Sequence, residues 1–303
     1  MGVNELVSPS LAQAGSSRVD ADRSRPRYAS LLVHVEARST ASDGRIALAV
    51  DLARRFGAML VGMAAESPQP PPVDVYGGVA FVGEIMEAED EQIRSDLQAA
   101  RDRFATLCPT ELLSEWRSAV ETPVQALARE ARSADLIVIG RDLSRLREGV
   151  YRSADPGDLL MRAGRPLLVV PPGAEALRAE RIVVAWKDTR EARRAVWDAL
   201  PLLVRAAAVH VVEVATEDDL EAAASRVGDV AAHLRRHGVA AKAETRTRRE
   251  ASDADELILV AEQDAADLVV AGGYGHSRLR EWVFGGVTAD LLKHCPKCCL
   301  LSH

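Results

Sequence analysis

The residues best suited to chemistry form a glycine-rich segment near the end of the chain, Gly272-Gly273-Tyr274-Gly275-His276-Ser277, and a second glycine pair follows in Gly285-Gly286-Val287-Thr288. Together they give the spacing Gly-x2-Gly-x9-Gly. Glycines let a backbone turn sharply and bring its N–H groups close to an anion. The second pair directly precedes a predicted helix, whose first amides favour a phosphate. The segment matches neither Gly-x4-Gly-Lys-Ser/Thr nor Gly-x-Gly-x2-Gly, so it predicts an anion site of another kind.

A cysteine cluster, His294-Cys295-Pro296-Lys297-Cys298-Cys299, is the second candidate. A Cys-x2-Cys pair is half of a zinc site, and the chain contains no second pair. His294, His303 or a second subunit could complete the ligands, which leaves metal binding open. The cluster follows a predicted helix, whose negative end should raise the pKa of a thiol. We therefore predict a structural role at the start of the last strand and assign no metal ligand.

General acid–base or nucleophilic chemistry finds no clear setting in the sequence. A nucleophile elbow and a His-Glu-x2-His motif are both absent from it. Asp188 and Glu213 fall near predicted strand ends, as many carboxylates do, and nothing marks either as a general base. We assign no catalytic residue; slow ATP hydrolysis stays open, but efficient catalysis is not expected.

Strands and helices alternate in the second half of the chain. Continuous apolar runs indicate strands buried on both faces, and apolar residues at helical spacing indicate the helices between them. Asp188 lies three residues before Glu191, a helix-start signal. The strands are expected at 182–186, 209–214, 239–245, 267–271 and 299–302, with helices around 192–203, 220–234, 254–261 and 287–293. This order predicts a parallel, doubly wound sheet, which binds ligands beyond the carboxyl ends of its strands.

The same pattern occurs twice. The run Asp-Leu-Ile-Val-Ile-Gly at 135–140 resembles Asp-Leu-Val-Val-Ala-Gly at 267–272, and Ser-Arg-Leu-Arg-Glu occurs at both 144–148 and 277–281. We therefore expect two tandem doubly wound α/β domains, each with a mainly parallel five-stranded sheet flanked by helices. The boundaries are a mobile tail at 1–28, a first half at 29–173 and a second half at 180–303. The first half has extra residues, which we expect in a loop around 69–78.

The glycine spacing, the strand at 182–186 and the run from Gly272 to Glu281 resemble the universal stress protein family, and the chain looks like a tandem member. The resemblance covers about residues 28–303. It implies binding of ATP or another adenine nucleotide, with or without Mg²⁺, although some members bind none. Its motif would bring Gly272 and Gly275 to the ribose and phosphates, bring Gly285, Gly286 and Val287 to the phosphates, and set Ala185 and Val212 beside the adenine.

The chain departs from the family pattern at two of these positions. Lys187 stands where the pattern has an Asp, and a lysine attracts phosphate but cannot accept a hydrogen bond from ribose or adenine. Gly286 replaces a Ser or Thr, a loss that Thr288 could make good. Arg278 is a further candidate phosphate contact, with a solvated loop charge as the alternative.

The first half is less well equipped for this chemistry. Arg141-Asp142-Leu143 replaces the second glycine, and the Ser-Arg-Leu-Arg-Glu alignment sets Arg152 and Ser153 opposite Gly285 and Gly286. Side chains there would fill the space of a phosphate, and Asp142 would repel it. We predict one competent site, in the second half, with the first half as its structural partner.

Composition and charge bound the remaining expectations. The chain has 303 residues, 48% of them hydrophobic and 27% charged, with a net charge of −7. An acidic chain with 4% aromatics argues against a nucleic-acid partner, and the absence of an apolar run of roughly 18 residues argues against a membrane partner. The start of the chain lacks a signal sequence, so we expect a cytoplasmic location.

The family resemblance also implies an internal pseudo-dimer, in which the strands 167–170 and 299–302 pair. A further homodimer and a partner protein stay open. The expected function is a stress-response nucleotide-binding regulator or protective factor, with a ligand-free scaffold or chaperone-like protein and a weak ATPase as the alternatives.

Overall fold

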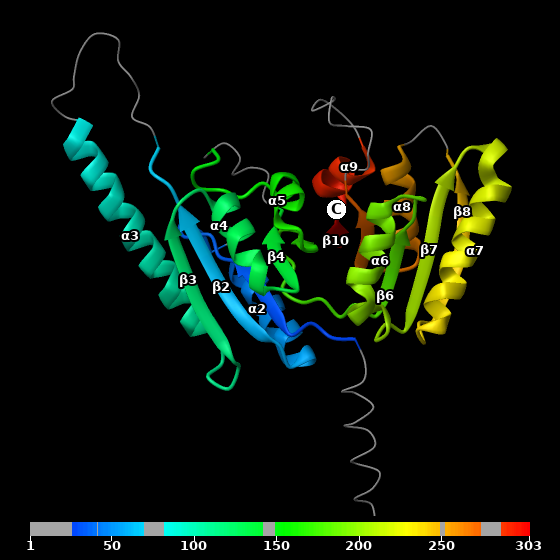
Figure 1. Cartoon of the computed structure of the whole chain (residues 1–303), viewed down its shortest axis with the longest axis horizontal. Coiled ribbons are helices and arrows are strands. Elements are labelled where there is room, and N and C mark those ends of the chain that lie inside the picture. The colour runs from blue at the N-terminus through cyan, green and yellow to red at the C-terminus, as the bar shows by residue number, and fades with distance from the viewer. Residues whose placement is uncertain (1–25, 41, 70–81, 142–148, 249–251, 274–285) are drawn as a thin grey trace, which may run out of the picture.

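Within the residues that the structure describes, ten strands form one continuous sheet in the order β3-β2-β1-β4-β5-β10-β9-β6-β7-β8, and Figure 1 shows their arrangement. The computed structural model describes residues 26–40, 42–69, 82–141, 149–248, 252–273 and 286–303. The strands are β1 (Ser30–His34), β2 (Met59–Glu66), β3 (Ser114–Val120), β4 (Leu136–Gly140), β5 (Leu167–Val170), β6 (Arg181–Ala185), β7 (Ala208–Ala215), β8 (Ala241–Thr247), β9 (Leu268–Gly272) and β10 (Cys298–Ser302).

Each half of the sheet is parallel, which confirms the predicted fold class. In the first half β1 pairs with both β2 and β4, and in the second half β6 pairs in the same way with β7 and β9. The two five-stranded sheets are joined, as the family resemblance led us to expect. β5 and β10 pair antiparallel, with Leu168 opposite Leu300, and so join the halves into one sheet. This pairing covers two strands that would otherwise be exposed sheet edges.

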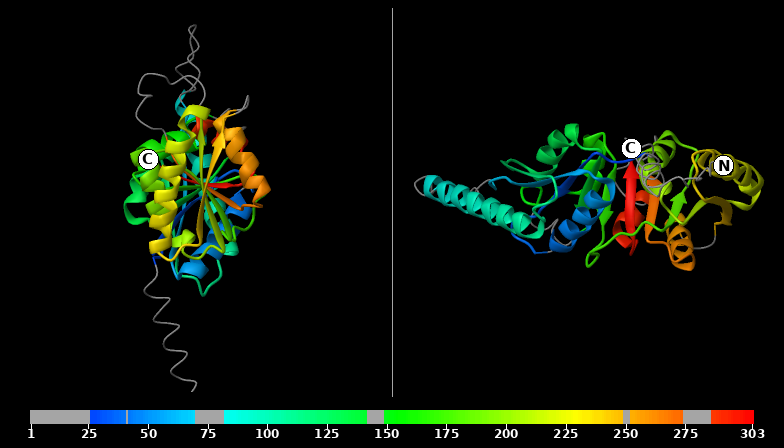
Figure 2. Two further views of the ribbon diagram at one scale, coloured as in Figure 1. Left: turned by 90° about the vertical axis from the view of Figure 1, so that its right-hand side faces the viewer. Right: turned by 90° about the horizontal axis from the view of Figure 1, so that it is seen from below.

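Helices cover both faces of the sheet, as Figure 2 shows. Side chains of α2 (Ser42–Phe56), α3 (Val82–Leu107), α6 (Arg190–Leu203) and α7 (Leu220–Arg236) contribute to one hydrophobic core. Those of α4 (Pro123–Glu130), α5 (Pro156–Ala163), α8 (Asp253–Gln263) and α9 (Val287–His294) contribute to the other. Alternate residues of a strand enter opposite cores, as Leu31 and Leu32 do, because successive strand side chains point to opposite faces.

The expected elements of the second half are confirmed, with shifts of one or two residues at their ends. The largest shift is in β8, which covers 241–247 instead of 239–245. The cap of α6 differs too, because the hydroxyl of Thr189, and not Asp188, accepts the Ala192 amide. Part of the extra length of the first half lies in a helix, since α3 has 26 residues and α7 has 17. The loop residues 70–81 lie outside the described ranges.

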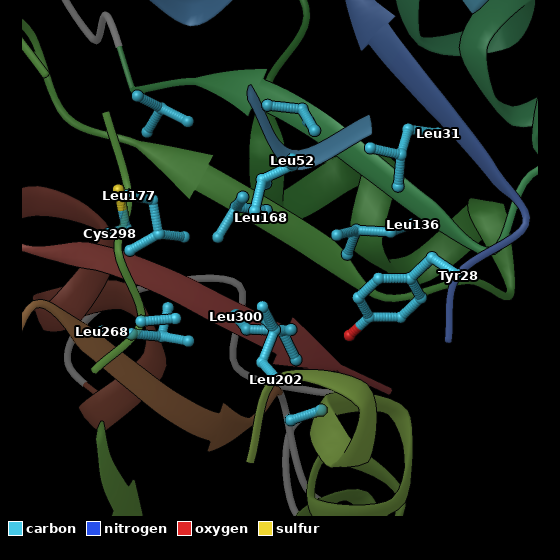
Figure 3. Close-up of a cluster of buried hydrophobic side chains, with 14 of the residues drawn as sticks. Tyr28, Leu31, Leu52, Leu136, Leu168, Leu177, Leu202, Leu268, Cys298 and Leu300 are labelled. Atoms are coloured by element: carbon cyan, nitrogen blue, oxygen red, sulfur yellow. The ribbon is translucent and has the colours of Figure 1, made fainter. Parts of the chain in front are cut away.

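The first core runs across the junction between the halves, where Leu168 and Leu300 lie among residues of both (Figure 3). Tyr28 belongs to it, which corrects the expected tail at 1–28. Its hydroxyl donates to the Asp198 carbonyl at 2.7 Å, and its ring meets Phe56 edge-on with 5.0 Å between centroids. Burial is the main cause that raises the pKa of Tyr28. Residues 1–25 lie outside the described ranges.

In the part of the chain that the structure describes, no helix is both long and apolar enough to span a bilayer.

Candidate functional site

The carboxyl ends of β6 and β9 mark the place in the second half where the strand order reverses. β7 and β8 lie on one side of this point, and β10 lies on the other. An open α/β sheet binds ligands in the crevice at such a point. The starts of α6 and α9 follow the ends of these two strands in the chain, and α9 begins at the second glycine pair.

Gly272 is in close contact with the start of α6. A Cβ at this position would lie 2.5 Å from the Ala192 backbone nitrogen and 2.7 Å from the Glu191 carbonyl carbon. No real Cβ makes such contacts, so residue 272 must be a glycine for α6 to pack here. The close approach that the sequence suggested for a ligand is made by the protein's own helix.

At the start of α9, too, polar groups are bonded within the protein. Gly286 is its N-cap in an extended conformation that any residue can adopt, and its carbonyl accepts the Asp290 amide. The Thr288 hydroxyl donates to the Gly272 carbonyl at 3.2 Å, and the residue is buried. The hydroxyl that could replace a phosphate-binding Ser or Thr is therefore directed to the backbone. The first amides of α9 are the donors that a helix leaves to an external acceptor.

Lys187 is exposed two residues beyond the end of β6. Ala185 is buried at the end of that strand, and Val212 is fully buried on β7, where its carbonyl accepts the Trp186 amide at 2.8 Å. Lys187 therefore offers an exposed positive charge just beyond the end of β6, whereas the Val212 side chain is buried and its carbonyl already accepts one hydrogen bond.

The two carboxylates weighed as general bases are both engaged. Asp188 pairs with Arg193, and Glu213 is buried and accepts Nη2 of Arg226 at 2.7 Å. Arg226 also bonds Asp219 at 2.6 Å and lowers the pKa of that carboxyl. Both carboxylates therefore have a structural role, as members of ion pairs with arginines. Of the other predicted site residues, Gly275, Arg278 and Gly285 lie outside the described ranges.

The equivalent point in the first half is filled by Arg45. This arginine is 4% exposed; its Nε donates to the His34 carbonyl at 2.9 Å, and its Nη2 donates to Ser42 Oγ at 2.9 Å and lies 3.3 Å from Glu36 Oε1. A Cβ on Gly140 would lie 1.8 Å from its Nη1. The guanidinium thus covers the end of β4.

The same helix position in the second half holds a small residue. The buried faces of α2 and α6 coincide when Ala49 is matched with Ala199, and Arg45 then matches Ala195. Glu36 matches Lys187, because each lies five residues beyond the equivalent strand positions Leu31 and Ile182. Sequence reasoning missed Arg45; the signal that could have found it was a lone arginine on the apolar face of a predicted helix.

The structure also changes which residues of the first half align with the second glycine pair. Leu159 and Leu160 of α5 occupy the buried positions that Leu291 and Leu292 occupy in α9. In this register Ser153 and Ala154, and not Arg152 and Ser153, stand opposite Gly285 and Gly286. Ser153 is buried, and its hydroxyl bonds the Gly149 carbonyl at 3.1 Å. Of the segment that replaces the second glycine, only Arg141 is described, and it contacts the Cys295 carbonyl.

The cysteine cluster is divided by the sheet. Cys295 and Cys299 lie in the core with α9, and Cys298 lies in the core on the opposite face. The Cys-x2-Cys pair therefore does not converge on one point, and within the described ranges no three His, Cys, Asp or Glu residues are placed to hold a metal ion.

The thiol pKa is raised for two of the three cysteines, but by causes other than the helix end that the sequence suggested. Burial raises the pKa of Cys298 to about 12, and the hydrogen bond to Cys295 together with burial raises that of Cys299. The prediction is wrong for Cys295. Its hydrogen bond with Cys299 is the main cause that lowers its pKa to about 7, and the Lys297 amide and the charge of Arg141 act in the same direction.

A cavity of about 250 Å³ lies away from both strand-order reversals, between α3 and the C-terminal part of β3. Arg94 and Arg101 line it together with Trp116. It therefore adds nothing to the crevice at β6 and β9.

Comparison with known proteins agrees with this architecture. Residues 179–303 match the universal stress protein family. A universal stress protein from Archaeoglobus fulgidus aligns over 90% of this chain and 97% of its own at 12% identity, with a TM-score of 0.65. A functionally unknown protein from Pseudomonas aeruginosa aligns over 93% and 94% at 14% identity, with a TM-score of 0.54. At these identities the two structures show a shared fold alone.

A universal stress protein solved in complex with cAMP aligns over 48% of this chain and 98% of its own at 25% identity. Its TM-score of 0.33 is too low to bear on the ligand of this chain. A search of curated proteins finds no match.

Proposed function

We propose that this protein is a nucleotide-binding stress regulator with one ligand site, in its second half. The proposal is supported by the match of residues 179–303 to the universal stress protein family and by the fold that the chain shares with a solved member. The site would lie at the ends of β6 and β9. A bound nucleotide would stabilise one conformation, which a partner reads.

The observation that carries the proposal is the contrast between Arg45 and Ala195. The first half fills its own crevice with a buried guanidinium that is bonded to Ser42 and the His34 carbonyl. The matched position of the second half is an alanine, and the strand end carries the exposed Lys187 instead of a buried glutamate. The positive charge of Lys187 beyond the end of β6 and the first amides of α9 would each favour an anion.

The residues in place suit the phosphates of a nucleotide better than its base. Lys187 and the α9 amides are all donors, which phosphate oxygens accept. A hydrogen-bond acceptor for the ribose or the adenine amine is missing at 187, and the Val212 carbonyl is already bonded to Trp186. We therefore expect affinity to rise with the number of phosphates, in the order AMP, ADP, ATP. Mg²⁺ would enter as the counter-ion of the phosphates.

The test begins with the purified full chain. Mass spectrometry of the denatured protein identifies any small molecule released from it, and calorimetric titration with ATP, ADP, AMP and cAMP gives the affinities. The expected result is a preference for ATP that Lys187→Glu weakens about tenfold, since one favourable charge contact is replaced by repulsion. Lys242→Glu, a lysine change on the far edge strand β8, is the matched control and should leave the affinity unchanged.

Gly285→Arg provides an independent test of the glycine spacing. The long side chain should abolish binding, as the phosphate space would be filled. Equal affinity of the wild type, Lys187→Glu and Gly285→Arg would overturn the proposed site. No released molecule and no heat with any nucleotide would favour a ligand-free scaffold, and Mg²⁺-dependent phosphate release above background would favour a weak ATPase.

A further inference from the structure

His233 and His237 form an exposed pair of imidazoles at the C-terminal end of α7. His233 lies in the last turn and His237 is the C-cap, so a spacing of four residues brings both to the same side of the helix. Their ring centroids are 4.8 Å apart. The Trp197 ring of α6 meets that of His237 edge-on, with 6.0 Å between centroids, and Trp197 is 62% exposed. The three rings form one cluster on the surface.

Within the described ranges, neither imidazole has a polar partner in the chain. No hydrogen bond or ion pair involves either ring there, and both residues are exposed. The pair also lies outside the buried positions of α7, which are Ala223, Val227, Ala231 and Leu234. Core packing and internal polar bonding therefore do not account for a histidine at 233 or 237.

The distance between the rings suits one metal ion held by both. Two imidazoles that bind the same metal at about 2.0–2.1 Å have ring centroids about 4.5–5 Å apart. The separation of 4.8 Å lies in this range. The ring planes are inclined at 70°, and the broad χ2 preference of histidine lets exposed rings each turn a nitrogen toward a shared ion. The C-terminus of a helix also favours a cation, because partial negative charge collects there.

Charged side chains near the pair act in both directions. Asp229, exposed one turn before His233, attracts a cation, whereas the exposed Arg236 repels one. Arg235 is turned away, since its Nη1 donates to the Ala241 carbonyl at 2.9 Å. Solvent and salt screen such exposed charges, so the lone pairs of the two imidazoles decide what the cluster binds.

We propose that His233 and His237 together bind a divalent transition-metal ion such as Zn²⁺. Imidazole nitrogen suits zinc, copper and nickel, whereas magnesium and calcium take oxygen ligands. Two protein ligands leave the other positions of the ion to water or to a donor on another molecule. The site does not depend on the proposed nucleotide site. α7 ends just before β8 begins, and Ala241 there pairs with Val209 at the start of β7, so the pair lies at the opposite end of the sheet from the carboxyl ends of β6 and β9.

Calorimetric titration of the full chain with Zn²⁺ tests the site. His233→Ala and His237→Ala should each weaken binding at least about tenfold, because losing either ring destroys the chelate. The double variant should bind no more weakly than the single variants, since a chelate is lost only once. His294→Ala, which removes a lone exposed histidine at the end of α9, is the matched control and should leave the affinity unchanged.

Trp197 provides an independent readout. Cu²⁺ bound by the pair should quench its fluorescence, and excess Zn²⁺ should restore it. Trp197→Phe should remove this quenching and keep the wild-type affinity for Zn²⁺. A wild type that gives no heat with Zn²⁺, or equal affinity in the wild type and the His233→Ala/His237→Ala variant, would overturn the proposal. All the substituted side chains are exposed, so these variants should fold as the wild type does.

Discussion

Gly140 and Arg45 occupy neighbouring space so closely that a Cβ on the glycine would lie 1.8 Å from Nη1 of the arginine. In the second half the corresponding glycine, Gly272, faces the backbone of α6 at 2.5 Å instead. The two halves thus use a glycine at the same strand end for different neighbours. One neighbour is the end of a side chain and the other is the rigid start of a helix.

Gly272→Ala should therefore destabilise the protein more than Gly140→Ala. The added methyl at 272 meets backbone that cannot give way, and we expect a cost of about 3 kcal/mol. At 140 it displaces the end of Arg45, for about 1–2 kcal/mol. Urea denaturation measures both.

Gly228→Ala in α7 is the control for the glycine series. A Cβ there meets nothing within 4 Å, so the change should stabilise by about 0.5–1 kcal/mol, as alanine favours a helix over glycine. Equal losses at 140 and 272 would contradict the packing difference.

The Arg45–Glu36 ion pair should behave as a buried pair. Arg45→Met leaves a buried carboxylate without its cation and should cost about 3–5 kcal/mol. Glu36→Met should also be costly, whereas the double variant should cost much less than the sum of the two. A double-mutant cycle by urea denaturation measures the coupling, and strict additivity would show that the pair is not coupled.

Gly273 and Leu160 offer a test of the junction between the halves. A Cβ at 273 would lie 2.3 Å from Leu160 Cδ2, and Leu160 is buried on α5 of the first half. Gly273→Ala should cost about 1–3 kcal/mol through overpacking. Leu160→Ala should cost about 2–4 kcal/mol through the cavity it leaves.

The double variant Gly273→Ala/Leu160→Ala should lose about 1 kcal/mol less unfolding free energy than the two single variants lose together. The new methyl group enters the space that the leucine side chain vacates. Thermal unfolding of the four proteins checks this. A double variant that shows the full sum would mean that the two residues do not share space.

Glu66 should make stability depend on pH. Burial is the main cause that raises its pKa; Asp96 also raises it, and Arg38 and Arg152 oppose the rise. A carboxyl with a raised pKa in the folded state stabilises the fold while it is protonated, and that contribution is lost as the pH rises through its folded pKa. Glu66→Gln should therefore gain stability relative to wild type as the pH rises above the ordinary carboxyl pKa of 4.5, as the midpoint of thermal unfolding would show.

Glu115→Gln is the control with the opposite sign. Hydrogen bonding to Arg117 lowers the pKa of Glu115, so its ionised form is the favoured one in the folded state. The glutamine variant should be less stable than wild type above the ordinary carboxyl pKa of 4.5, and this difference should shrink as the pH falls below that value. The effect should be small, because the Glu115 side chain is 42% exposed. Parallel pH profiles for the two variants would contradict the assigned causes.

The order of strands and helices could be predicted from the sequence because it depends on the local spacing of apolar residues. The apolar run at 182–186 and the helical spacing from Ala192 to Leu203 each act over a few residues, and β6 and α6 follow them closely. The repeated Asp-Leu-x-Val-x-Gly runs likewise predicted β4 and β9. Pairing of residues 167–170 with 299–302 followed from the family resemblance.

The candidate site depended on contacts between distant segments, which periodicity does not encode. The glycines at 140 and 272 look alike in sequence, but the first lies under Arg45 and the second against the start of α6. Thr288 had the right type for a phosphate contact, yet its hydroxyl turns to the Gly272 carbonyl.

The sequence by itself therefore determined the two similar halves, their elements and the residue types at each strand end. Only the tertiary structure decided that Arg45 closes one crevice and Ala195 leaves the other without a guanidinium, and that the sheet separates Cys298 from Cys295 and Cys299. The physical reason is the sequence separation of the residues that interact. Apolar spacing acts among neighbouring residues of one element, whereas the filling of a crevice depends on where side chains from separate elements meet.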